Sequence, residues 1–322
     1  MTANTPIVTV LIVNWNAGDY ITRCLQTINR DYPVVIVDNN SEDGSVDKVL
    51  SRFPAVKVLN SPVNLGFSAG NNLGLKEITT KYVLFLNPDT EIIGDAINVM
   101  VAFLESHSDY AAVGPRIIDR NGQISIFSGR RHFNLWMAFC EVFMLDKMFP
   151  KNKWLNYRHI PEWDRKTSRD VDCLVGCAML MRTDIVKELG GFDESVPLYL
   201  DDVDLCRKVT ESGGRIRCVA EANVWHIHNV SCSKAPAIWI THVYFLASYV
   251  YLKKYGNPLI ANCYLVLVWF GGLARVTAFL LAYSINHKYR PKLVTAFHMV
   301  TFPMCYLKGA KIEKVFDQKS LS

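Results

Sequence analysis

A short apolar run that ends at a proline limits most strongly what this chain can fold into. Tyr82 to Leu86 is apolar throughout and contains β-branched and aromatic residues, which predicts a strand buried on both faces of a parallel sheet. The run stops at Asn87-Pro88-Asp89, because Pro88 has no N–H to donate to a neighbouring strand. Asp89 is therefore expected at the carboxyl end of a central strand, where open α/β sheets bind ligands. A carboxylate there can hold a divalent cation against a diphosphate, or it can cap the next helix.

Strand-like and helix-like segments alternate through the first 120 residues. The predicted strands, besides Tyr82–Leu86, are Ile7–Val13, Val34–Val37, Val56–Leu59 and Ala111–Ile117, and the predicted helices are Asp19–Asn29, Val46–Phe53, Asn64–Ile78 and Asp95–Ser106. This order predicts an α/β fold with a mostly parallel, Rossmann-like sheet and helices on both faces. Asn14, Asp38 and Asp89 each follow a strand, and right-handed crossovers bring such positions to one edge of the sheet. Together they predict a nucleotide pocket, although each one singly is more often a turn former.

The glycines of Asn64 to Asn72 exclude two common nucleotide motifs. Gly66, Gly70 and Gly74 do not have the GxGxxG spacing, and no GxxxxGK[ST] occurs in the chain. This stretch can still place backbone N–H groups near a ligand at the start of a helix. The alternative is that the glycines allow a helix to pack closely on the sheet.

The second half carries another group of carboxylates. Asp172–Arg182 and Arg217–Ala220 are predicted strands, and helices are predicted at Asp184–Leu189 and from Asp202 onward. Asp201 and Asp202 fall in the first turn of that helix, where the helix dipole favours negative charge. One aspartate suffices as a cap, so one of the two is a candidate general base that takes a proton from a hydroxyl.

The stretch Asp119 to Asp170 is irregular and rich in Trp, Arg and His. It is interpreted either as a lid or acceptor-facing segment, or as an ordinary surface excursion with apolar anchoring. Arg130 and Arg131 could meet a phosphate, but two adjacent arginines more often form a solvated face.

The C-terminal third is both apolar and basic. From Ser231 onward there are eleven Lys/Arg and two Asp/Glu, a charge of +9, whereas the rest carries 24 minus 28, or −4, which returns the total of +5. Leu259 to Ala274 has no charged residue, and Arg275 interrupts before Val276 to Ile285. Because about 20 apolar residues are needed to span a bilayer, helices lying on a membrane surface are favoured over a span. The alternative is a helical cap that covers the sheet or forms a dimer; nucleic-acid binding would require a more polar basic segment.

The cysteines and the N-terminus bear on the compartment. The nine cysteines form no CxxC pair and mostly lie in apolar runs, which indicates a reducing compartment without a disulfide framework. Met1 to Pro6 is short and polar, and it lacks the features of a signal peptide.

Four stretches of the sequence form a set of motifs: Val-Asn-Trp-Asn (13–16), Val-Asp-Asn-Asn-Ser-Glu-Asp-Gly-Ser (37–45), Asn-Leu-Gly-Phe-Ser-Ala-Gly-Asn-Asn (64–72) and Leu-Asn-Pro-Asp (86–89). Taken together they resemble the family 2 inverting glycosyltransferases, and most closely their rhamnosyltransferase branch. The resemblance covers Ile7 to Ser231 and implies a GT-A fold and a nucleotide-sugar donor, dTDP-rhamnose in that branch. The Gln-x-x-Arg-Trp signature of the processive synthases is absent after Asp204, so one sugar is expected per encounter.

The resemblance also implies roles for individual residues. Asp38 would accept a hydrogen bond from the base, with Asn14, Asn16, Gly70 and Asn71 beside the nucleotide. Asp89 would be the metal-binding end of the DXD motif, whose first position here is Asn87. His226 matches the family's His-x-x-x-x-Ser element, which ends at Ser231, and would bind the metal or the diphosphate, whereas His228 fails that spacing. Asp202 would be the general base, with Asp201 in place of the family's Glu.

The sequence thus predicts a metal-dependent (Mg²⁺ or Mn²⁺) inverting glycosyltransferase at the cytoplasmic face of a bacterial inner membrane. Residues 1–235 would form the catalytic domain and residues 236–322 a helical, membrane-associating region that can also support a homo-oligomer. The donor would be a nucleotide-diphosphate sugar and the acceptor a lipid-linked saccharide of cell-surface polysaccharide synthesis. Two other classes stay open. A nucleotidyltransferase would need a Gly-rich, Lys/Arg-bearing loop after the first strand, which Asn14 to Gly18 lacks, and the other class is a non-catalytic membrane scaffold.

Overall fold

The computed structural model describes residues 6–196, 198–227 and 237–307. The strands are β1 Val8–Asn14, β2 Val34–Asp38, β3 Lys57–Asn60, β4 Tyr82–Leu86, β5 Thr90–Ile93, β6 Tyr110–Ile118, β7 Arg169–Asp170, β8 Ala178–Arg182 and β9 Arg215–His226. The α-helices are α1 Asp19–Thr27, α2 Ser45–Arg52, α3 Gly66–Leu75, α4 Ala96–Ser106, α5 Leu135–Val142, α6 Leu145–Met148, α7 Thr183–Glu188, α8 Asp201–Glu211, α9 Ala237–Tyr255, α10 Pro258–Ile285 and α11 Arg290–Leu307.

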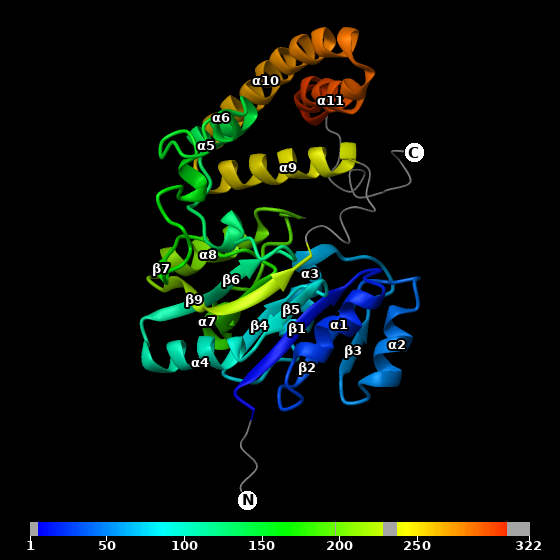
Figure 1. Cartoon of the computed structure of the whole chain (residues 1–322), viewed down its shortest axis with the longest axis vertical. Coiled ribbons are helices and arrows are strands. Elements are labelled where there is room, and N and C mark those ends of the chain that lie inside the picture. Colours follow the sequence, from blue (N-terminus) through cyan, green and yellow to red (C-terminus); the bar gives the residue numbers. More distant parts are fainter. Residues whose placement is uncertain (1–5, 197, 228–236, 308–322) are drawn as a thin grey trace, which may run out of the picture. The chain divides into compact units, whose positions relative to one another are not determined.

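One nine-stranded sheet organises the first part of the chain (Figure 1). Its order is β3-β2-β1-β4-β8-β6-β9-β5, and β7 pairs with β9. β3, β2, β1 and β4 run parallel, as predicted, so their carboxyl ends share one edge. Beyond β4 the sheet is mixed, because β8 pairs antiparallel with both β4 and β6.

Helices cover both faces of this sheet. Alternate residues of β1, such as Val10 and Ile12, lie in a buried apolar cluster with residues of α1 and α4. On the opposite face, α3 approaches β1 so closely that a Cβ added at Gly74 would lie 2.2 Å from Leu11 Cδ1. The predicted α/β architecture with flanking helices is therefore confirmed.

Several predicted element boundaries were wrong, each for a local reason. The predicted strand Asp172–Arg182 is a strand only from Ala178, because Cys173 pairs with Arg130 instead of with a strand of the sheet. β5 was not predicted, since Pro88 was taken as the end of all pairing, yet the chain resumes at Thr90 and pairs antiparallel with β9. The predicted strand Arg217–Ala220 is the middle of the longer β9.

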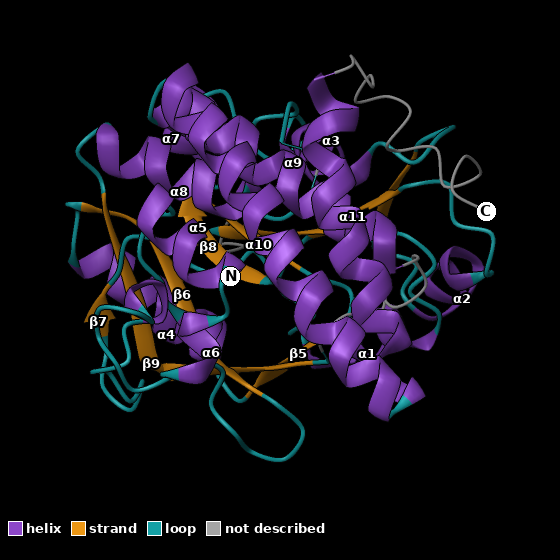
Figure 2. Cartoon of the chain, turned by 90° about the horizontal axis from the view of Figure 1, so that it is seen from above, coloured by secondary structure: helices purple, strands orange, loops and turns teal. Residues whose placement is uncertain are grey.

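The contacts divide the chain into two units. The first contains the sheet, and the second joins Phe133–Pro161 and Leu198–Leu200 to the C-terminal helices. In Figure 2 the strands, drawn in orange, all belong to the first unit as far as the described residues go. The predicted domain boundary at residue 235 lies outside the described residues.

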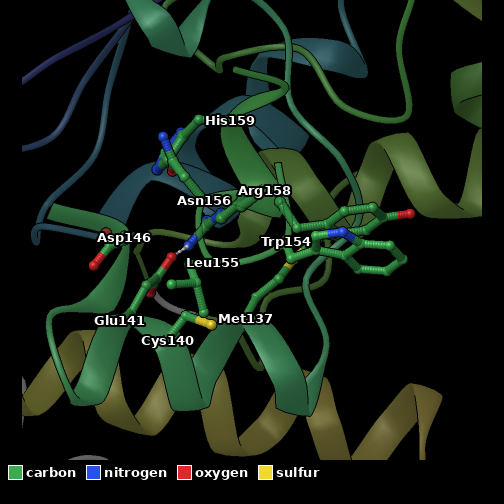
Figure 3. Close-up of a pocket in the computed structure, with 10 residues that line it drawn as sticks. Met137, Cys140, Glu141, Asp146, Trp154, Leu155, Asn156, Arg158 and His159 are labelled. Atoms are coloured by element: carbon green, nitrogen blue, oxygen red, sulfur yellow. Dashed lines mark hydrogen bonds and ion pairs between the residues drawn. The ribbon is translucent and has the colours of Figure 1, made fainter. Parts of the chain in front are cut away.

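The helical unit is held together by buried polar contacts (Figure 3). Arg158 Nη1 donates to Glu141 Oε1 at 2.5 Å and to Tyr244 Oη at 3.0 Å, which fixes α9 to α5. The neighbouring cavity has a volume of about 10 Å³, roughly the room that one water molecule needs. α10 runs unbroken through Gly271-Gly272. A Cβ at Gly271 would lie 2.1 Å from Val142 Cγ1 of α5, and a Cβ at Gly272 would lie 2.9 Å from Met299 Cβ of α11. Both glycines thus permit close helix packing.

Candidate active site

A hydrogen-bond network around Asn14 fixes the loop after β2. Asn14 and Asp38 are paired at the carboxyl ends of β1 and β2. The fully buried Asn14 Nδ2 lies 2.8 Å from Asp38 Oδ1, 3.1 Å from Ser41 Oγ and 3.0 Å from Ser45 Oγ. Asp38 Oδ2 accepts from Ser41 N at 2.9 Å, so the carboxylate is held by the loop it begins. Because Asn14 has no exposed surface, it can orient the Asp38 carboxylate only from the protein interior.

Asn16 ties the loop after β1 to the same segment. Its backbone N–H donates to Ser41 Oγ at 2.9 Å, and its Oδ1 accepts from Glu42 N at 2.8 Å. Gly18, at φ +59°, donates its N–H to Asp43 Oδ2 at 2.7 Å. The two loops that frame the carboxyl ends of β1 and β2 therefore hold each other in place.

Gly70 and Asn71 of α3 have packing partners that explain their presence. A Cβ at Gly70 would lie 2.9 Å from Val13 Cγ1, which any larger residue would have to displace. Asn71 is buried and donates from Nδ2 to Phe67 O of its own helix at 3.0 Å. The close-packing alternative for the glycines thus has direct structural support, whereas their nucleotide role remains a prediction.

Asp89 and His226 lie side by side where β4 passes into β5. Thr90 of β5 pairs with His226 of β9, and Ile227 N donates to Asp89 O at 3.0 Å. His226 Nε2 lies 3.3 Å from Asp89 Oδ1, and both residues are buried. Burial disfavours the imidazolium, but Cys177 and the Asp89 carboxylate outweigh it and raise the pKa of His226 to about 10. His228 and Ser231 lie outside the described residues.

This pair offers a carboxylate, which suits Mg²⁺ and Mn²⁺, and an imidazole, which is more typical of transition-metal sites. Among the described residues there is no group of three His, Cys, Asp or Glu that could hold a metal ion. The Asp89 carboxylate still fits a cation that takes its remaining ligands from a diphosphate and water, the usual arrangement for Mg²⁺ in phosphate sites, and His226 would add one nitrogen ligand. His226 would have to release its proton before it could bind the cation.

Asp201 and Asp202 begin α8, as predicted, and they differ in their surroundings. Asp202 Oδ2 accepts from Gly176 N at 2.9 Å and from Arg130 Nη2 at 2.6 Å, and Oδ1 accepts from Val203 N at 2.8 Å. Asp201 is buried, and burial together with the charge of Asp202 raises its pKa well above the ordinary value. Burial and the neighbouring charge therefore favour the neutral form of the Asp201 carboxyl group.

Arg130 is the functional candidate that sequence reasoning missed. The solvated-face interpretation is wrong for it, because only 7% of Arg130 is exposed and it pairs with Asp202. Arg131, its neighbour, pairs with Glu162 Oε1 at 2.9 Å in a partly exposed position. The acidic, apolar start of α8 did indicate in the sequence that a cationic partner is needed, since buried carboxylates need a cation. Nothing in the sequence says which arginine is that partner.

Asp38 and Asp89 lie at one edge of the sheet, and hydrogen bonds connect Asp202 to the segment that carries Asp89. Asp38 ends β2, and Asp89 follows β4, which lies on the other side of β1. Asp202 accepts from Gly176 N, and Cys177, the next residue, accepts from Asn87 N at 2.9 Å. Backbone contacts thus tie Asp202 to the segment that carries Asp89. Such an edge is the usual ligand-binding position of open α/β sheets.

Comparison with known protein families identifies the class of protein to which a chain with this fold and this sheet edge belongs. The sequence model of glycosyl transferase family 2 matches residues 9–190, more than half of the chain. The chain belongs to this family.

Curated relatives narrow the resemblance within that family. An N-acetylglucosaminyl-diphospho-decaprenol L-rhamnosyltransferase of Mycobacterium tuberculosis is 25% identical over 264 residues, covering 77% of this chain and 84% of the relative. Rhamnosyltransferase WbbL of Escherichia coli is 25% identical over 229 residues, covering 68% of this chain and 83% of the relative. The chain is thus rhamnosyltransferase-like in sequence.

Solved structures confirm the GT-A fold. A mannosyltransferase from Pyrobaculum calidifontis, in complex with GDP-Man and Mn²⁺, matches with a TM-score of 0.53 at 15% identity, over 96% of this chain and 89% of that one. GalNAc-T7, solved with UDP, GalNAc and Mn²⁺, also gives a TM-score of 0.53 at 16% identity, over 78% of this chain and 51% of that one.

Proposed function

We propose that this chain is an inverting glycosyltransferase that transfers rhamnose from dTDP-rhamnose to a lipid-linked saccharide. The observation that carries the proposal is that Asp38 and Asp89 with His226 lie at one sheet edge of a family 2 chain, to which hydrogen bonds through Gly176 and Cys177 connect Asp202. The names of the two rhamnosyltransferase relatives support the sugar, and the decaprenol-linked substrate in one name supports the acceptor class.

The nucleotide would bind above β1 and β2. Among the hydrogen bonds of the described residues, Asp38 Oδ2 accepts one, from Ser41 N, and a carboxylate oxygen can accept two. It therefore retains capacity to accept the ring N–H of thymine or uracil. Asn14 and Asn16 hold the two loops that would enclose the base.

The diphosphate would lie beside Asp89 and His226, which would hold Mg²⁺ or Mn²⁺. The presence of Mn²⁺ in two structures of the same fold supports a divalent cation. When bound, the cation supplies positive charge against the negative charge that develops on the leaving diphosphate.

Asp202 would act as the general base. It takes the proton of the acceptor hydroxyl as that oxygen forms a bond to the sugar C1, and the bond from C1 to the phosphate oxygen breaks with its electron pair leaving on the diphosphate. Attack from the face opposite the leaving group inverts the configuration at C1. Asp201, whose pKa burial raises, is less suited to this role because its neutral form is favoured.

The helical unit supports membrane association. α10 is 28 residues long, and by length and apolar composition it could cross a membrane. Five of its exposed apolar residues recur at three-, four- and seven-residue spacing along one side: Leu259, Val266, Phe270, Leu273 and Leu280. Arg275 lies on the opposite side, where Nη2 donates to Glu141 O at 3.0 Å and Val142 O at 2.8 Å. Two backbone carbonyls within the unit thus hold the guanidinium of Arg275, which favours peripheral binding by the apolar stripe at the cytoplasmic face of the bacterial inner membrane.

The test combines binding with transfer. Thermal melting with dTDP, UDP, GDP and their sugars, each with and without Mn²⁺, should show the largest rise with dTDP-rhamnose and metal, because a ligand of the native state raises its stability. Transfer to a lipid-linked acceptor should then fall at least about 100-fold in Asp202→Asn. Transfer that survives this substitution would remove Asp202 as the base. A wild type that binds no nucleotide sugar would instead favour the scaffold alternative, and nucleotide transfer from a triphosphate would favour a nucleotidyltransferase.

A further inference from the structure

Arg130 reaches Asp202 from a distant part of the sequence. Its Nη2 donates to Asp202 Oδ2 at 2.6 Å, and the exposed fractions of the two side chains are only 9% and 11%. We infer that Arg130 is a positioning residue for sugar transfer, which orients Asp202 so that Oδ1 takes the proton of the acceptor hydroxyl. The inference rests on the proposed function, because it assumes that Asp202 is the base.

The two oxygens of Asp202 are occupied to different extents. Oδ2 accepts from both Arg130 Nη2 and Gly176 N, which uses its two lone pairs. Oδ1 accepts only from Val203 N at 2.8 Å among the hydrogen bonds of the described residues. Oδ1 therefore has a lone pair available for an incoming hydroxyl. Without Arg130 the carboxylate could rotate, and this difference between its oxygens would be lost.

Arg130 is itself held in place by the segment that also contacts the base. Its backbone exchanges hydrogen bonds with Cys173, N to O and O to N, each at 2.9 Å. Nη2 also lies 3.3 Å from Leu174 O, and the guanidinium lies 5.9 Å from the Phe127 ring centroid. Residues 173–176 thus contact Arg130 at one end and Asp202 at the other. A planar guanidinium can meet both Asp202 and Leu174 O in this frame, whereas an ammonium is a single point charge on a flexible stem.

Arg131 provides a matched control within the same segment. It has the same charge and also pairs with a carboxylate, but its partner is Glu162 and not Asp202. Replacing Arg131 removes one positive charge at nearly the same place in the chain. An effect on transfer that is specific to Arg130 therefore reports its contact with Asp202 and not a general loss of charge.

The experiment compares Arg130→Met, Arg130→Lys and Arg131→Met with the wild type. For each protein, kcat and KM for dTDP-rhamnose are measured between pH 5.5 and 9 with the lipid-linked acceptor, and thermal melting monitors folding. Arg130→Met should lower kcat at pH 7 by about 100-fold, the scale of general-base catalysis, while KM for the donor changes less than about twofold.

The conservative variant keeps the inference testable if Arg130→Met does not fold. Arg130→Lys should retain part of the activity, with kcat reduced by about tenfold at pH 7, and Arg131→Met should match the wild type in kcat and KM. Wild-type kcat in Arg130→Lys and in any folded Arg130→Met would overturn the inference while leaving the proposed function intact. Equal losses in Arg130→Lys and Arg131→Met would overturn it as well. A wild type that binds nucleotide but transfers no sugar would refute the proposed function, and the inference with it.

Discussion

Replacing Asn14 tests whether the loop that carries Asp38 depends on one buried amide. The side chain has no exposed surface, and its Nδ2 lies within 3.1 Å of oxygens on Asp38, Ser41 and Ser45. Two N–H groups are shared among these three acceptors, and one of the acceptors is a carboxylate. A hydrogen bond to a charged group contributes about 1.5–3 kcal/mol and a neutral one about 0.5–1.5 kcal/mol. Asn14→Ala is therefore expected to lower the free energy of unfolding by about 2–4 kcal/mol.

The same substitution should weaken nucleotide binding, although Asn14 does not reach the surface. A released Asp38 carboxylate would occupy its binding orientation for a smaller fraction of the time, and a tenfold loss of nucleotide affinity corresponds to about 1.4 kcal/mol. Urea denaturation measures the stability, and calorimetric titration with dTDP measures the affinity. For the stability measurement, Asn71→Ala is the matched control, because Asn71 is also a buried asparagine but donates to its own helix. Equal losses of stability in the two variants would refute the special role of Asn14.

Three further predictions address the base, the metal and the membrane. Asp201→Asn should keep transfer within about tenfold of the wild type, in contrast to Asp202→Asn. Because burial raises the pKa of Asp201, the wild type loses stability as the pH rises through that pKa. Asp201→Asn should therefore raise Tm more at pH 8 than at pH 5. Smaller gains at pH 8 than at pH 5 would contradict that sign. His226→Gln should abolish most of the extra thermal shift that Mn²⁺ gives with dTDP, and an undiminished Mn²⁺ effect would remove His226 as a ligand. Phe270→Glu on α10 should reduce sedimentation with anionic vesicles, whereas Leu50→Glu, at an exposed apolar position on α2, should not; equal binding by both would argue against the stripe.

Sequence periodicity predicted the parallel half of the fold because each of its elements is locally determined. The strand Tyr82–Leu86 was predicted to the residue, since a fully apolar run bounded by Lys81 and Asn87 permits little else. The helix Leu135–Val142 was missed because Trp, Phe and Cys fill it without an amphipathic pattern, and α10 packs against it. The role of Gly271 in that packing could not be predicted either, because Val142, the residue that a Cβ at Gly271 would meet, lies more than a hundred residues away in the sequence.

The candidate site shows the same division between local and distant information. Asp38 and Asp89 could be placed from the sequence, because their position follows from where a strand ends. The pairing of Asp89 with His226 could not, since it depends on β9 running antiparallel to a strand that the sequence did not reveal. A sequence motif gives the chemical type of a side chain, whereas the tertiary structure gives the residue that this side chain contacts.

The start of α8 shows why that partner decides the chemistry. Asp201, Asp202 and Asp204 are all buried within the first turn, and such a cluster cannot carry three uncompensated charges. Lys208 Nζ lies 3.6 Å from Asp204 Oδ2, and Arg130 Nη2 lies 2.6 Å from Asp202 Oδ2, whereas no ion pair to Asp201 occurs among the described residues. With two cations for three carboxyl groups, Asp201 is the one for which the neutral form is favoured, in agreement with its raised pKa. Adjacent aspartates that are equivalent in sequence thus have unequal partners, and the arginine that pairs with Asp202 lies 72 residues away along the chain.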